Sequence, residues 1–250
     1  MAVDALAALI ADRGPCVALT GAGMSTESGI PDFRSATGIW AEVDPYEVAS
    51  IDAFHRDPER VWRWYASRIH SLLDAEPNRG HRTLAALERA GHVQAVVTQN
   101  IDTLHTRAGS VEVVEVHGSI RRATCLACAT PEPVDGVLEQ LESGPVPRCR
   151  ACGAVLKPDV VMFGELLPVG PFARAERLAR ETGLLLVVGS SLQVWPAAGL
   201  PETAIAHGGA LAIVNDEETP FDWQADVVAR GPAGETLSAV AALLDAGGSS

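Results

Sequence analysis

The chain has 250 residues, a hydrophobic share of 47 % and a formal net charge of −13. A chain of this length and composition can bury a full core, so we expect a folded globular protein. The excess of acid argues against nucleic acid as a partner, because phosphate binding needs clustered lysine and arginine. The N-terminus carries Asp4 where a signal peptide would carry bases, and no apolar run is long enough for a membrane span. We therefore expect a cytoplasmic protein without membrane contact.

The first half of the chain predicts helices that alternate with apolar strands. Apolar residues recur at helical spacing before Gly14-Pro15, and residues 35–50 show no clean period, as in a loop that could cover a site. In order, we expect a helix at 3–12, a strand at 17–20, helices at 58–74 and 81–90, and strands at 93–98 and 111–116.

The second half returns to this alternation after an irregular segment from about 119 to 156. We expect a helix at 171–181, a strand at 184–188, a helix at 197–207 and a strand at 210–214. Strands that are apolar throughout and alternate with helices indicate an α/β fold, with a parallel sheet covered by helices on both faces.

A glycine-rich loop, residues 21–34, follows the first strand. Its glycines allow a sharp turn and a close approach to a ligand, and a strand that ends in this way can bring a phosphate to backbone N–H groups. Thr26 replaces the third glycine of the dinucleotide fingerprint, and the segment around Glu42 does not read as a strand. The loop thus suits a nucleotide but not a plain dehydrogenase. A simple glycine turn remains the alternative.

Polar residues follow several of the other predicted strands. Ligands of parallel sheets bind beyond the carboxyl ends of the strands, where Asn100, Asp102 and His117 are expected. The imidazole of His117 could accept a proton near neutral pH. A structural role for this histidine, and turn or cap roles for Asn100 and Asp102, remain alternatives.

Four of the five cysteines form two Cys-x-x-Cys pairs separated by residues 129–148. Cys125, Cys128, Cys149 and Cys152 fit a tetrahedral zinc site, which would be structural because four protein ligands leave no open position. A redox dithiol is the alternative, but neither pair stands at a predicted helix start. The fifth, Cys16, reads as a small buried hydrophobe.

Together these motifs resemble the sirtuin family in their order along nearly the whole chain. They are residues 21–35, Thr98–Asp102, Val116–Gly118, the cysteine pairs, Phe163–Glu165, Gly189–Pro196 and Val214–Asp216. The resemblance implies an NAD-dependent protein-lysine deacylase with a large Rossmann-like domain, residues 1–34, 76–118 and 157–250. It also implies a small domain made of two insertions, a helical and cofactor-loop insertion at 35–75 and a zinc-binding insertion at 119–156.

The resemblance also implies roles for individual residues. His117 and Asn100 would be catalytic, with His117 as the base that takes a proton from a ribose hydroxyl once the acyl oxygen of the acyl-lysine has displaced nicotinamide. The products would be nicotinamide, lysine and O-acyl-ADP-ribose. The substrate peptide would pair with Phe163, Gly164 and Glu165. The residues expected to bind NAD are Gly21, Ala22, Gly23, Thr26, Asp32, Phe33, Arg34, Trp40, Gln99, Asn100, Ile101, Asp102, Gly189, Ser190, Ser191, Asn215, Asp216 and Ala233.

Tyr65 and Arg68 resemble the Tyr-x-x-Arg pair of sirtuins that remove succinyl, malonyl and glutaryl groups. Three residues apart on a helix, a phenol and a guanidinium stand on one face, and a guanidinium suits a carboxylate. Ala49 matches a small residue that leaves room for a longer acyl chain. Core packing of Tyr65 and solvation of Arg68 are the alternative. For the whole chain, the other candidates are a mono-ADP-ribosyltransferase, a non-catalytic NAD or acyl-lysine sensor and, least favoured, a hydride-transfer oxidoreductase.

Overall fold

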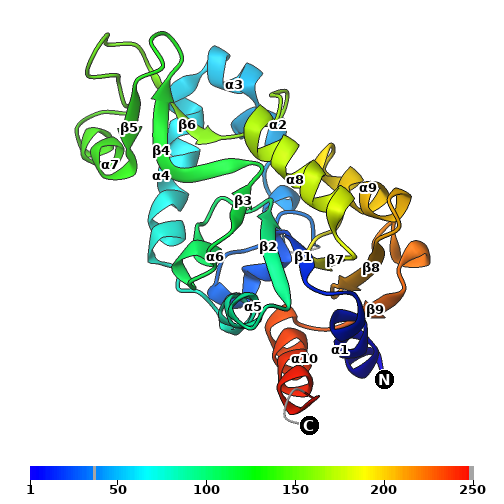
Figure 1. Cartoon of the computed structure of the whole chain (residues 1–250). Helices are drawn as coiled ribbons and strands as arrows, with labels where there is room; N and C mark the ends of the chain where they lie inside the picture. Colours follow the sequence, from blue (N-terminus) through cyan, green and yellow to red (C-terminus); the bar gives the residue numbers. More distant parts are fainter. Residues whose placement is uncertain (36–37, 248–250) are drawn as a thin grey trace.

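A six-stranded parallel sheet forms the centre of the computed structural model, which describes residues 1–35 and 38–247 (Figure 1). The strand order is β3-β2-β1-β7-β8-β9, so the chain builds outward from β1 in one direction and from β7 in the other. Such a reversal leaves a crevice at the carboxyl ends of the two central strands. The strands are β1 (Cys16–Thr20), β2 (Val93–Thr98), β3 (Val113–Glu115), β7 (Leu184–Val188), β8 (Ala210–Val214) and β9 (Val227–Ala229).

Helices cover both faces of this sheet. One face packs against α1 (Ala2–Arg13), α5 (Arg79–Arg89) and α10 (Ala233–Gly247), and the other against α8 (Val169–Glu181) and α9 (Leu200–Ala206). Side chains of a strand alternate between faces, so in β1 Ala18 joins the first core cluster while Val17 and Leu19 join the second. The expected α/β class, with helices on both faces, is confirmed.

A smaller unit lies at the end of the molecule away from the two termini (Figure 1). It combines the helices α3 (Ile51–Arg56) and α4 (Pro58–Asp74) with a three-stranded sheet, β5-β4-β6, and α7 (Val134–Ser143). Its sheet strands are β4 (Gly118–Cys125), β5 (Pro131–Pro133) and β6 (Leu156–Val160). The buried Trp62 joins the helix α4 to the small sheet, because its indole Nε1–H donates to the carbonyl of Leu156 on β6 at 2.7 Å.

Several elements differ from the sequence predictions. The strands β4, β5, β6 and β9 and the helices α3, α7 and α10 were not predicted, and Ala233 is the first residue of α10. The Ala-rich α10 shows little contrast between its faces, and β9 is too short to show a period. The expected loop at 35–50 contains the short helices Ile39–Ala41 and α2 (Pro45–Val48), and its residues 36 and 37 lie outside the described part of the chain.

A short helix, α6 (Leu104–Arg107), follows β2. The next strand, β3, covers only Val113–Glu115 and is shorter than the predicted strand at 111–116. Within the described residues, no helix combines the length and the apolar character that crossing a bilayer requires.

Candidate active site at the carboxyl end of the sheet

A cavity of about 400 Å³ opens at the carboxyl ends of the central strands. It collects most of the residues that the sequence analysis assigned to cofactor and substrate. The expected residues that line it are Gly21, Ala22, Gly23, Thr26, Asp32, Phe33, Arg34, Trp40, Tyr65, Gln99, Ile101, His117, Phe163, Gly164, Glu165, Gly189, Ser190, Ser191, Asn215, Asp216 and Ala233. Three expected residues, Asn100, Asp102 and Arg68, are not part of its lining.

The loops that follow β1 and β7 touch each other through glycine backbone. The N–H of Gly23 donates to the carbonyl of Gly189 at 2.8 Å. Gly189 has a φ of +60°, and a Cβ there would lie 2.3 Å from the backbone nitrogen of Met24. No other residue fits this approach, which leaves bare backbone at the floor of the cavity. A pyrophosphate can approach such a bare backbone closely, so the loop fits an NAD phosphate.

Asn100 and Asp102 lie beneath the glycine-rich loop. The side-chain amide of Asn100 donates to the carbonyl of Gly21 at 2.9 Å and to the hydroxyl of Ser25 at 3.1 Å. That hydroxyl in turn donates to the carboxylate of Asp102 at 2.6 Å, and burial raises the pKa of Asp102. Both side chains are buried and therefore hold the loop from behind, where the structure places them out of contact with the cavity.

His117 presents a neutral imidazole to the cavity. Its Nδ1 lies 3.0 Å from the carbonyl of Gln99, which can only accept, so the proton sits on Nδ1 and Nε2 is left with its lone pair. Burial lowers the pKa of His117, and the positive charge of Arg34 lowers it further, against the opposing effect of the Gln99 hydrogen bond. At neutral pH the imidazole is therefore deprotonated and can accept a proton.

An aromatic wall closes one side of the cavity. The ring of Trp40 stacks on Phe33, with centroids 5.1 Å apart, and on Trp64 at 5.9 Å, while Phe163 meets Trp40 edge-on at 6.2 Å. All four side chains line the cavity, and so does the buried Ala49. Aromatic walls of this kind bind the flat or aliphatic part of a ligand.

Tyr65 and Arg68 meet the cavity differently. Tyr65 is buried in its wall, and burial raises the pKa of the phenol well above its ordinary value. Arg68 is half-buried, and its guanidinium carbon lies over the ring of Trp64, 4.3 Å from the ring centre. It also donates hydrogen bonds to the Trp64 carbonyl and the Ser67 hydroxyl. Its guanidinium thus stands near the cavity and outside its lining.

Some lining residues were given no role by the sequence analysis. They are Ser35, Trp64, Val160, Val161, Met162, Leu167, Val194, Trp195, Pro196, Val214, Glu217 and Gly231. Val194–Pro196 belong to the Gly189–Pro196 motif, and Trp64 is the neighbour of Tyr65 in the sequence. The sequence could therefore have suggested that these residues line the site. The strand end at 160–162 had no such signal, because its place depends on the pairing of β6 with β4.

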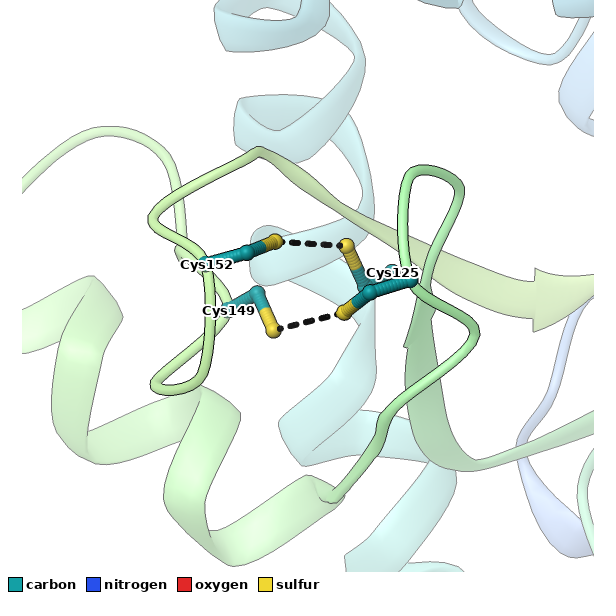
Figure 2. Close-up of side chains that lie close together, drawn as sticks. Cys125, Cys149 and Cys152 are labelled. Carbon is teal, nitrogen blue, oxygen red and sulfur yellow. Dashed lines mark hydrogen bonds between the residues drawn. The ribbon is translucent and has the colours of Figure 1, made fainter.

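The four paired cysteines come together in the small unit. Their sulfur atoms all lie within 4.8 Å of one another, and the pairs Cys125–Cys152 and Cys128–Cys149 are each 3.5 Å apart. Figure 2 shows Cys125 facing Cys149 and Cys152 across the space between two loops. A tetrahedral zinc with Zn–S bonds of about 2.3 Å separates its sulfurs by about 3.8 Å, whereas a disulfide needs about 2.05 Å. The thiols therefore fit one structural zinc ion, as the sequence analysis expected.

Comparisons with known proteins agree with this geometry. The sequence profile described as "Sir2 family" matches residues 21–196. An "NAD-dependent protein deacetylase" of Sulfolobus acidocaldarius is 47 % identical over 90 % of this chain and 88 % of its own length, and "NAD-dependent protein deacylase 1" of Archaeoglobus fulgidus is 44 % identical over 91 % and 92 %. Among solved structures, "Structure of Sir2Tm bound to a propionylated peptide" superposes with a TM-score of 0.89, at 40 % identity and over all of both chains.

Proposed function

The chain belongs to the Sir2 family, and on this basis we propose that it removes acyl groups from protein lysine side chains in a reaction that consumes NAD. The single observation that supports this most strongly is the cavity at the switch point of the sheet. There the bare glycine backbone and the neutral imidazole of His117 line the same space. NAD would be the co-substrate and would supply the carbon to which the acyl oxygen is transferred. The zinc ion would hold the small unit in shape.

The chain's own residues would position NAD and the peptide and would take a proton from the ribose hydroxyl. The backbone of the Gly21–Gly23 loop, which Asn100 holds from behind, would lie against the pyrophosphate. Phe163, Gly164 and Glu165 would receive the peptide backbone, and the aromatic wall would enclose the acyl-lysine stem. The Nε2 atom of His117 would take the proton from the ribose hydroxyl, a contribution of about 10²–10⁴ in rate. One water molecule would complete the reaction, with nicotinamide, the free lysine and O-acyl-ADP-ribose as products.

The test uses an acylated and a matched unmodified peptide with NAD, followed by mass spectrometry. We expect equal amounts of free lysine, nicotinamide and O-acyl-ADP-ribose. His117→Ala should lose the reaction while His207→Ala, at an exposed histidine, keeps it. ADP-ribose retained on the protein, or peptide binding without turnover in the intact enzyme, would instead identify a transferase or a sensor.

Within this activity, we propose a preference for succinyl- and malonyl-lysine over acetyl-lysine. Arg68 supports it: in a strongly acidic chain, no carboxylate among the described residues lies within ion-pair distance of this guanidinium. Glu42 attracts it only at longer range, and Tyr65 lies close enough to affect its pKa. An acidic acyl group would be bound if Arg68 turned from Trp64 toward the phenol. Ala49 leaves space for the longer chain.

Arg68→Met tests this preference. A hydrogen bond to a charged group contributes about 1.5–3 kcal/mol, so kcat/KM for succinyl-lysine should fall roughly ten- to hundredfold, with acetyl-lysine nearly unchanged. Arg63→Met is the matched control, because Arg63 lies on the same helix but pairs with Glu59 on the exposed side. Equal losses on both substrates would contradict an acidic-acyl preference and leave the deacylase activity itself intact.

A further inference from the structure

Lys157 is the single lysine of this sequence, and it is buried. It lies on β6 with only 7 % of its surface exposed. The other residues counted as Lys or Arg in the sequence are all arginines. A lysine ammonium has three N–H donors and is strongly hydrated, so its burial requires a protein acceptor for each donor. The position of this one lysine is therefore informative.

Three acceptors surround the ammonium. Its Nζ donates to the carbonyl of Pro158 at 3.0 Å and to the carbonyl of Val160 at 2.9 Å, and it forms an ion pair with Glu165 Oε2 at 2.9 Å. The same carboxylate oxygen accepts the backbone N–H of Met162 at 2.8 Å. All three donors of Lys157 are used, and the chain from 157 to 165 is folded around one charge.

That segment forms a wall of the active-site cavity. Residues 160–165 line the cavity, whereas Lys157 lines a second cavity, of about 860 Å³, that shares Val160, Val161 and Glu165 with the first. The wall has three further attachments. The N–H of Val161 donates to the carbonyl of His117 at 2.8 Å. Phe163 donates its N–H to the carbonyl of Ala49 at 2.8 Å and accepts the N–H of Ile51 at 3.0 Å.

The turn beyond Phe163 has few other restraints. Gly164 has a φ of +90°, and the N–H of Glu165 returns to the carbonyl of Met162 at 3.0 Å. The Glu165 carboxylate ties this turn back to Met162 and to the ammonium. A buried charge that loses its partner is strongly unfavourable, so the turn would rearrange if either member were removed.

We propose that the Lys157–Glu165 ion pair is a positioning device that holds the turn at Met162–Glu165 in the shape that receives the acyl-lysine peptide. This inference rests on the proposed deacylase function. Lys157 acts through Glu165 and the backbone of the turn, without contact with the NAD-binding loop. Its loss should therefore weaken peptide binding more than NAD binding.

The experiment measures KM for the peptide, KM for NAD and kcat separately, in the full-length enzyme. Lys157→Met should raise the peptide KM at least tenfold, with the KM for NAD changed less than twofold. Lys157→Arg should recover part of this loss, because a guanidinium can still pair with Glu165. Arg122→Met is the control, since it breaks an ion pair with Asp159 in the same small sheet, away from the turn, and should leave both KM values unchanged.

A second variant covers the case in which Lys157→Met does not fold. Glu165→Gln keeps an acceptor for the Met162 N–H but removes the charge, and it should raise the peptide KM to a similar extent. The double variant should be no worse than either single one, because both remove the same interaction. A peptide KM within twofold of the original in the folded variants, or an equal rise in both KM values, would overturn the positioning role. Absence of turnover in the unmodified enzyme would instead reject the proposed function.

Discussion

The buried pair His81 and His105 predicts a specific loss of stability in acid. His81 lies on α5 and is fully buried, and its ring packs against His105 with centroids 4.7 Å apart. Burial lowers the pKa of His81 to about 4 and holds the pKa of His105 well below its ordinary value. Both rings are neutral in the folded protein. The two histidines lie behind the active-site cavity. His105 contacts the hydroxyl of Thr20, which donates to the hydroxyl of Thr98, and that hydroxyl accepts the backbone N–H of Asn100.

The magnitude follows from the difference between the folded and unfolded pKa of His81. An unfolded histidine titrates near 6.5, so below this pH the unfolded chain binds more protons and stability falls. The loss grows as the pH falls and levels off near the folded pKa of about 4. Between pH 7.5 and pH 5, His81 alone should cost about 2 kcal/mol of unfolding free energy.

The assay is urea unfolding of the original protein and of His81→Gln at both pH values. Glutamine cannot titrate, yet its carbonyl can still accept the N–H of Asn78 that His81 Nδ1 accepts at 3.3 Å. The variant should be less stable at pH 7.5 but should lose about 2 kcal/mol less on acidification. The exposed His207→Gln serves as the control and should follow the original protein. An equal acid loss in His81→Gln and the original would refute the reasoning.

Three further predictions follow from the site and its supports. The acid limb of the kcat–pH profile should lie below pH 6.5, because His117 must be neutral to act and its pKa is lowered. Arg34→Gln removes a positive charge that lowers this pKa, so it should shift the limb to higher pH. An unshifted limb would contradict this role of Arg34. Metal analysis should find one zinc per chain, and Cys152→Ser should lose it and lower the melting temperature, whereas retention of full stability would argue against a structural ion. Because Lys157 is the single lysine and is buried, succinic anhydride should modify only the N-terminal amine of the folded protein. Intact mass should show a second adduct, on Lys157, only after unfolding. A second adduct on the folded chain would show that the Lys157 ammonium is accessible.

The sequence by itself determined the alternation of helices and strands and therefore the parallel sheet. Continuous apolar runs such as Leu184–Val188 can be buried only between two layers. A glycine-rich turn after the first strand is typical of a nucleotide-binding loop, but by itself it also fits a simple turn. The same local signals carried the zinc site, since the two Cys-x-x-Cys pairs have the spacing of a closed tetrahedral site. The helix α10 and the three-residue strand β9 were not predicted, because neither shows a clear hydrophobic period in the sequence.

Only the tertiary structure decided which polar residues meet the cavity. Asn100 and His117 both follow strands, yet Asn100 supports the glycine-rich loop from below while His117 lines the space above it. Helical spacing places both Trp64 and Tyr65 within reach of Arg68, and only the structure shows that the guanidinium lies on the ring of Trp64. The partners of Lys157 depend on how the nine-residue stretch 157–165 turns at the end of β6. The contacts of Asn100 and His117 join segments that are far apart in the sequence, and a local pattern carries no record of them.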